Sequence, residues 1–217
     1  MGFGILFYGF LMMIEITVRT QVGSPVGIDI FPDLAGYLLM LAAACRLDGY
    51  AKGFTYFRKL LYPLIVLGAA AYAIGMLSLF GKELALLETL SNAVKLLSLA
   101  LQGVAFFFLF AGVISLANEV DLPGIATRAR YTAIVGTVYY VFQLVLSICY
   151  QVGMAQKTLA PFSFTSMVIF IVFVLLGEVV LFNCYRYICY EGEENYLPSS
   201  ADNPIARFMN KLFKKSK

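Results

Sequence analysis

Glu178 is the residue with the clearest potential for chemistry, because it is a carboxylate inside a long apolar run. Apolar residues flank it on both sides over 174–181, and the next charged residue, Arg186, follows about two helical turns later. Charge in the hydrocarbon core of a membrane is costly and often marks function. Glu178 could bind a proton or a cation, or anchor a substrate. The alternative is a buried carboxyl, neutral or paired with an arginine, that fixes helix packing.

Four other polar residues complete a candidate intramembrane site. They lie within or at the ends of apolar runs: Glu15, Lys95, Gln102 and Gln143. Lys95 serves either as a counter-ion for an acidic group or as a snorkelling side chain that reaches the membrane surface. Glutamines in membrane helices commonly form interhelical hydrogen bonds, each worth about 1 kcal/mol or less. The sequence leaves open whether these groups meet in space.

A second candidate site is acidic and lies around the first polar loop. Asp29 and Asp33 stand on either side of the start of the second apolar run, and Glu15 can pair with Arg19 four residues later on one helix face. These groups could line a vestibule on the outer face that admits a cation. The alternative is an ion pair within one helix and an acidic helix N-terminus, which the helix dipole favours.

The absence of histidine restricts the reactions open to this chain. Without it there is no His-Glu-x-x-His zinc site and no Ser-His dyad. The four cysteines form no Cys-x-x-Cys motif, and we expect reduced thiols. We therefore predict no catalytic residue, no metal site and no cofactor. The small net charge of +3 argues against a nucleic-acid partner.

The elements that carry these residues are membrane spans. Hydrophobic residues make up 61% of the 217-residue chain, charged residues 13%, and the mean hydropathy is +0.83. An apolar run of about 20 residues crosses a bilayer as a helix. The sequence predicts an all-α integral membrane bundle of about six transmembrane helices within a domain over 1–190. The six predicted spans are 2–18, 30–47, 60–80, 93–117, 131–152 and 162–185.

Lysine and arginine orient this bundle. Most of the 16 basic residues lie in the loop after the second span, in the loop after the fourth span and in the tail. Loops rich in Lys and Arg stay in the cytoplasm. We therefore predict that both termini are cytoplasmic and that the protein resides in a bacterial cytoplasmic membrane as a multi-pass protein.

The tail over 191–217 contains a predicted amphipathic helix at 204–215. Apolar residues recur there at helical spacing, with basic residues between them: Arg207, Lys211, Lys214 and Lys215. Such a helix lies on anionic lipid headgroups. The alternative is a helix that packs on cytoplasmic loops. The aromatic and basic stretch 50–59 could lie in the membrane plane similarly, although Gly49 and Gly53 weaken a helix there.

The stretch 26–37, Val-Gly-Ile-Asp-Ile-Phe-Pro-Asp-Leu-Ala-Gly-Tyr, carries a family resemblance. It resembles a segment that opens the second span in small uncharacterised membrane proteins of Firmicutes-type bacteria. The likeness extends over about the first 60 residues. It implies a shared fold and no particular activity, and capping and close packing explain its Asp, Pro, Gly and Tyr positions.

Two classes of function remain open on the sequence. The first is transport or binding of a small molecule or an ion within the membrane, which the intramembrane polar residues favour. The alternative is a non-catalytic membrane subunit or scaffold that associates with anionic lipid or with a partner protein. A membrane enzyme is disfavoured, because the chain has neither His nor spaced Asp motifs.

Overall fold

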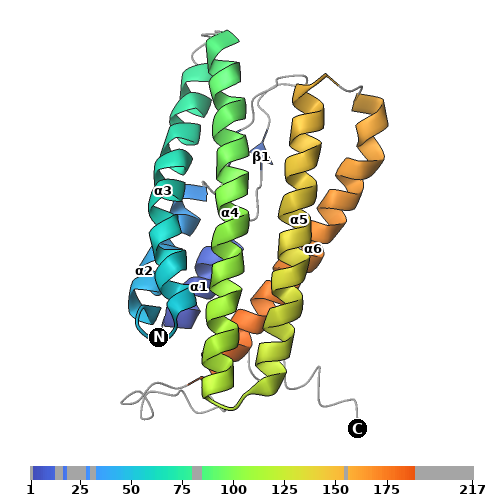
Figure 1. The fold of residues 1–217 in the computed structure, drawn as a ribbon. Coiled ribbons are helices and arrows are strands. Elements are labelled where there is room, and N and C mark those ends of the chain that lie inside the picture. The colour runs from blue at the N-terminus through green and yellow to red at the C-terminus, as the bar shows by residue number, and fades with distance from the viewer. Residues whose placement is uncertain are drawn as a thin grey trace. The chain divides into compact units, whose positions relative to one another are not determined.

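The chain folds into helices joined at one point by a short two-stranded ribbon (Figure 1). The structure, a computed structural model, describes residues 2–12, 17–18, 28–29, 33–79, 85–153 and 156–188. Within them the helices are α1 (Gly2–Leu11), α2 (Asp33–Leu47), α3 (Lys52–Leu79), α4 (Ala85–Glu119), α5 (Pro123–Gln151) and α6 (Gln156–Tyr187). Strands β1 (Thr17–Val18) and β2 (Ile28–Asp29) pair antiparallel. The chain divides into two compact units, Met1–Arg186 and Tyr187–Lys217, and the helical bundle belongs to the first.

Four of the helices are long and apolar enough to cross a membrane. The qualifying segments of α3 to α6 are 26 to 31 residues long, whereas a span needs about 20. By helix length and hydropathy this is an all-α, multi-pass membrane protein. The helices extend beyond the predicted spans, mostly at their N-terminal ends, because the flanking polar residues continue the helical backbone.

The first predicted span is wrong at its C-terminal end. The sequence predicts a span over 2–18, but α1 ends at Leu11, and Thr17 and Val18 form a strand. The β-branched residues Thr17, Val18 and Ile28 favour extended backbone, and Glu15 interrupts the apolar run. With 10 residues, α1 is about 15 Å long, which is about half of the hydrocarbon thickness. The 15-residue α2 is also shorter than a full span.

Helix α1 packs antiparallel against α2 through glycines. A Cβ at Gly2 would lie 2.8 Å from Leu47 Cγ, near the end of α2, and a Cβ at Gly9 would lie 2.9 Å from Met40 Cγ. Both separations are too short for a side chain. The two short helices therefore approach as closely as they do because Gly2 and Gly9 have none.

The stretch 50–59 does not form a separate in-plane helix. Its residues 52–59 are the start of α3, and Phe54 and Phe57 are buried in the bundle. A Cβ at Gly53 would lie 2.7 Å from the carbonyl oxygen of Phe108. The glycine that weakens an isolated helix thus allows α3 to contact α4, and this tertiary packing outweighs the low helix propensity.

The α2–α3 corner is fixed by polar contacts. Gly49 has φ of +100°, a conformation that suits glycine in the turn. Asp48 accepts a hydrogen bond of 2.7 Å from the Thr55 hydroxyl and forms an ion pair with Arg58. The carboxylate therefore joins the turn to the first two turns of α3.

The connection between α4 and α5 is only three residues long. Asp121 has φ of +58°, its N–H donates to the Asn118 carbonyl at 3.4 Å, and the Leu122 N–H donates to the Ala117 carbonyl at 2.8 Å. This is a Schellman motif, which satisfies carbonyls at the end of α4, and Pro123 then starts α5. The residues 123–130, expected to be loop, are the first two turns of a helix.

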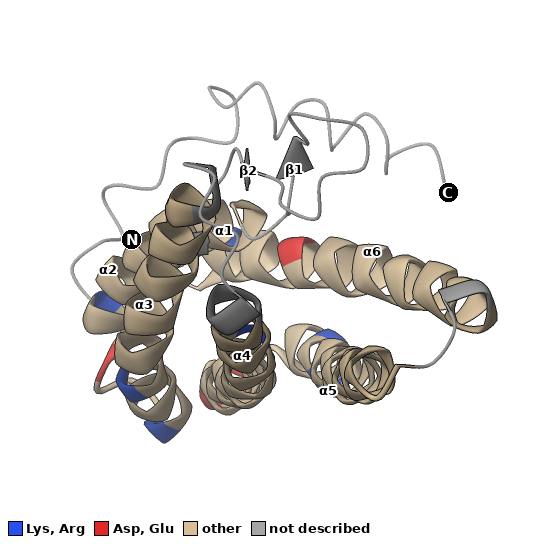
Figure 2. Cartoon of the chain, turned by 90° about the horizontal axis from the view of Figure 1, so that it is seen from above, with Lys and Arg blue, Asp and Glu red and all other residues tan. Residues whose placement is uncertain are grey.

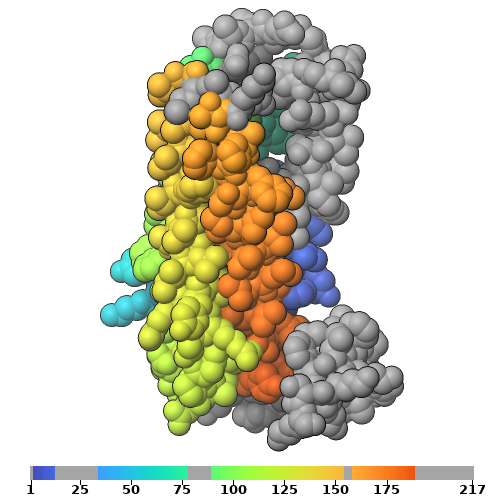
Figure 3. All heavy atoms as spheres, turned by 90° about the vertical axis from the view of Figure 1, so that its right-hand side faces the viewer, coloured from blue at the N-terminus to red at the C-terminus, as the bar shows by residue number. Residues whose placement is uncertain are grey.

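Helix α6 crosses the bundle obliquely (Figure 1), and its neighbours change near Phe173. Figure 3 shows α5 and α6 side by side on one face. Before Phe173, α6 contacts α5; after it, α6 contacts α1. The Phe173 ring lies within about 6 Å of five other rings, those of Phe10, Phe106, Phe110, Tyr139 and Tyr140. This aromatic cluster joins α1, α4, α5 and α6.

The turns α2–α3 and α4–α5, the start of α1 and the end of α6 lie at the same end of the bundle (Figure 1). Most basic residues of the described helices lie at that end: Arg46, Lys52, Arg58, Lys59, Arg128, Arg130 and Arg186. Figure 2 shows that the described helices are mostly tan, with only scattered charged residues. We call this end of the bundle the basic end.

Candidate functional site

Glu178 lies on α6 below the aromatic crossing, on the segment that contacts α1. Both of its carboxylate oxygens are buried, and neither has a hydrogen-bond partner among the residues that the structure describes. Most buried polar atoms in proteins do have one. The adjacent Gly177 packs against Phe10 and Phe110. Glu178 is therefore a carboxylate held among apolar groups without compensation from the described helices.

The contacts between α6 and α1 place Glu178 at the end of α1. The two helices run antiparallel: Tyr185 contacts Gly4, and the Phe182 ring lies 6.3 Å from the Phe7 ring. Further along, Gly177, the residue before Glu178, packs against the Phe10 ring. Glu178 therefore lies near the last turn of α1, which ends at Leu11.

The end of a helix has its own electrostatics. The last four carbonyl groups of an α-helix have no partner within it, and the C-terminus bears about half a negative charge. This partial charge lies near Glu178, because Phe10 in the last turn of α1 packs against the adjacent Gly177. Two groups of the same sign in an apolar setting favour a proton or a cation between them. Carbonyls at the C-terminal ends of interrupted helices coordinate Na⁺ or H⁺ in membrane transporters.

Gln102 belongs to a different contact. Its Nε2 donates a hydrogen bond to the Tyr37 hydroxyl, joining α4 to α2. The Tyr37 ring is almost fully buried and lies beside Gly68 of α3. The expectation of an interhelical hydrogen bond is confirmed, and the role of Gln102 is to connect helices.

Gln143 is likewise bonded between helices. Its Oε1 accepts a hydrogen bond of 2.6 Å from the Ser166 hydroxyl, joining α5 to α6. A second contact lies two turns further along α5, where the Tyr150 and Ser163 hydroxyls are 2.8 Å apart. We call these two contacts the α5–α6 polar seam. Ser166 is 12 residues from Glu178, which is about 18 Å along α6.

The structure does not bring together the four predicted intramembrane residues that it describes. Lys95 is exposed on α4, seven residues or about 10 Å before Gln102. Gln102 and Gln143 have partners on different helices, and Glu178 lies apart from both contacts. Of the four candidates whose side chains are described, Glu178 alone is buried without a partner among the described residues.

The remaining predicted site residues lie in β2, at the start of α2 or outside the described residues. Asp29 is in β2 opposite Thr17, and Asp33 is the first residue of α2. The others lie outside the described residues: Glu15, Arg207, Lys211, Lys214 and Lys215, with the whole predicted helix 204–215. Over the described parts of the chain, no three His, Cys, Asp or Glu residues cluster as ligands for a metal ion.

Two features of the site were not predicted from the sequence. The Ser166 hydroxyl, partner of Gln143, is one of several serines and threonines near the start of α6, and nothing in the spacing distinguishes it. The sequence did not predict that α1 ends at Leu11, because apolar residues continue to Ile14. The polar residues from Glu15 to Arg19 were the available signal that the helix stops early.

The function has to be inferred from the residues of the site themselves. The described site consists of one unpaired carboxylate, one helix end and the surrounding aromatic rings. No protein-family model, no curated protein and no solved structure matches this chain.

Proposed function

We propose that this protein binds a small cation, a proton or Na⁺, within the membrane and transports it, with the Glu178 carboxylate as the binding group. The observation that carries the proposal is the burial of both Glu178 oxygens without a partner among the described residues. An ionisable group of this kind in a membrane helix is a functional site by default. One carboxylate matches one positive charge, which suits a proton or a monovalent cation.

The position of α1 supports the same function. A helix that stops partway across the membrane directs its terminal carbonyls into the bundle, and α1 is about half as long as the hydrocarbon core is thick. Its last turn lies near Glu178, because Phe10 packs against the adjacent Gly177. A carboxylate and a helix C-terminus together form a negative environment for a cation.

The proposal includes six membrane-embedded helices. Helices α3 to α6 cross the bilayer, and α1 and α2 enter it as a shorter antiparallel pair. The basic end faces the cytoplasm by the distribution of Lys and Arg, in a bacterial cytoplasmic membrane. The protein has no catalytic role in this proposal, since a chain without histidine has few means of acid–base catalysis near neutral pH.

Proteoliposomes test the proposal. The protein is reconstituted with a trapped pH-sensitive dye, and a potassium diffusion potential drives proton entry; radioactive Na⁺ uptake is measured in parallel. We expect flux of one of these ions, and we expect Glu178→Gln to lower it at least about tenfold, because the neutral amide removes the charge that binds the ion.

The matched control is Glu119→Gln, which makes the same chemical change at an exposed carboxylate on the last residue of α4. Its flux should equal that of the wild type. Equal loss in both variants, or wild-type vesicles that pass neither ion, would contradict the proposal. Absence of flux together with co-purification of a stoichiometric partner protein would favour the alternative, a non-catalytic membrane subunit.

A further inference from the structure

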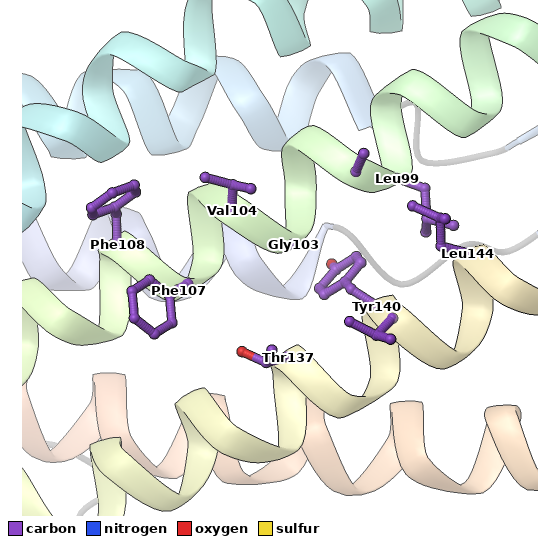
Figure 4. Close-up of a pocket in the computed structure, with 10 residues that line it drawn as sticks. Leu99, Gly103, Val104, Phe107, Phe108, Thr137, Tyr140 and Leu144 are labelled. Carbon is purple, nitrogen blue, oxygen red and sulfur yellow. The ribbon is translucent and has the colours of Figure 1, made fainter.

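A groove runs along the outer surface of the bundle between α4 and α5 (Figure 4). Its volume is about 420 Å³, within the usual range for ligand sites. Its lining is almost wholly apolar and comes from both helices: Leu99, Ala100, Gly103, Val104, Phe107, Phe108, Thr137, Tyr140, Val141 and Leu144. The groove is separate from Glu178, which lies on α6.

Small residues make the groove possible. Gly103 lies at its centre, and a Cβ there would come 2.9 Å from Tyr140 Cβ, so the two backbones are close at this level. On the outer surface the exposed fractions of Phe107 and Val141 are 50% and 59%. The Thr137 hydroxyl is already satisfied, because it donates to the Ala133 carbonyl at 2.8 Å. The groove therefore suits a flexible hydrocarbon that brings no polar group of its own.

One end of the groove leads toward the basic end of the bundle. Arg130 precedes Thr137 by seven residues, which is two turns, so it lies on the same face of α5 and about 10 Å further along. On α4, Ser115 follows Phe108 by the same interval. Arg130 and Ser115 are both exposed, and within the described chain no ion pair joins Arg130 to Glu119 or Asp121.

We propose that this groove binds an acyl chain of an anionic phospholipid and that Arg130 binds its phosphate. The groove lies between two membrane-spanning helices, with its apolar lining exposed on the outer surface, where lipid chains are the surrounding medium. Arg130 lies on the face of α5 that lines the groove. It is about 10 Å beyond Thr137, where the headgroup of a lipid with its acyl chain in the groove would lie. Guanidinium groups bind phosphate with charge-assisted hydrogen bonds. The charge of Arg130 selects an anionic headgroup over a zwitterionic one.

Native mass spectrometry of the full chain in detergent tests the proposal. The protein is titrated with palmitoyl-oleoyl phosphatidylglycerol and, separately, with phosphatidylcholine of the same chains. We expect tighter binding of the anionic lipid and a loss of about fivefold in Arg130→Gln, the effect of one basic residue near an anionic lipid surface. The matched control is Arg128→Gln, because Arg128 precedes Thr137 by nine residues and lies on the opposite face of α5.

A second pair of variants tests the groove itself. Ala100→Leu fills the groove from an exposed lining position and should weaken binding of both lipids at least about fivefold, since it displaces the chain. Ala71→Leu adds the same volume at an exposed position on α3 and should leave binding unchanged.

Three results would overturn the proposal. Equal losses in Arg128→Gln and Arg130→Gln would mean diffuse attraction to the basic end. Unchanged lipid binding in Ala100→Leu would mean that the groove is not the site. A dimer that dissociates in Ala100→Leu, without lipid in either state, would mean that a second copy of the chain fills the groove.

Discussion

Helix α6 carries two polar positions whose neighbours in the bundle differ. In the α5–α6 polar seam, Ser166 donates to Gln143 at 2.6 Å, and both groups are satisfied. About 18 Å further along the same helix, the Glu178 oxygens are buried without a partner among the described residues. A polar residue in an apolar helix is therefore evidence of function only when the neighbouring helix fails to satisfy it.

The difference arises from the neighbours of α6. At the seam α6 lies beside α5, a 29-residue helix that supplies side chains at every level. Beyond Phe173 it lies beside α1, which ends at Leu11. A full-length helix can offer a partner to each polar group that it passes. Glu178 lies near the last turn of α1, and no described residue offers its carboxylate a partner.

Phe173→Ala should have the largest effect, because this residue lies between the two regions and holds both. Its ring is 1% exposed and packs against rings from α1, α4 and α5. Removing it should cost about 3 kcal/mol through a cavity and lost contacts. Thermal unfolding in detergent measures the loss. Phe164→Ala, at a ring that is 67% exposed on the same helix, is the control and should change little.

Glu178→Leu should stabilise the protein by about 2 kcal/mol, because it removes a buried polar group without a partner. Gln143→Leu should have the opposite sign, since it leaves the Ser166 hydroxyl unpaired. Thermal unfolding of the two variants compares the regions directly. A loss of stability in Glu178→Leu would show that the carboxylate has a partner in the folded protein and would weaken its assignment as an ion site.

Ser166→Ala should lower stability by about 1 kcal/mol, because the Gln143 carbonyl then loses its donor. Combining it with Gln143→Leu completes a double-mutant cycle. We expect a coupling energy of about 0.6 kcal/mol, the average for hydrogen bonds between membrane helices. A coupling near zero would remove the distinction between the seam and Glu178.

Lys95→Gln should have the smallest effect. Lys95 is exposed on α4, which favours the interpretation of a snorkelling side chain over that of a counter-ion. Ion flux should stay within about twofold of the wild type, with an unchanged melting temperature. A tenfold loss of flux would join Lys95 to Glu178 and restore the single polar site that the sequence allowed.

Much of the fold was predictable from the sequence. The four longest apolar runs lie in α3, α4, α5 and α6, because a bilayer demands about 20 apolar residues and the residues between the runs are polar. The hydrogen bonds of Gln102 and Gln143 to other helices were expected from the cost of an unpaired amide in an apolar interior.

The partners in those bonds were not predictable. Tyr37 lies 65 residues from Gln102, and only the packing of α2 against the bundle brings them together. Likewise, Gly53 on its own predicts a weakened helix. Its contact with Gly112 and Phe108 of α4 explains why a glycine stands there. Spacing along one helix determines which residues share a face, but it does not determine which face of another helix they meet.

The shortness of α1 has a consequence for how the protein is made. Phe10 of α1 packs against Phe106, Phe110 and Phe173, and Gly4 packs against Tyr185. These four partners are all synthesised much later than α1. At common elongation rates, Phe173 leaves the ribosome roughly ten to thirty seconds after Phe10. During that interval a helix of 10 residues is too short to hold itself across a bilayer. The segment that completes the surroundings of Glu178 is therefore made early and packs first against α2, and its contacts with α4 and α6 form only after those helices have been made.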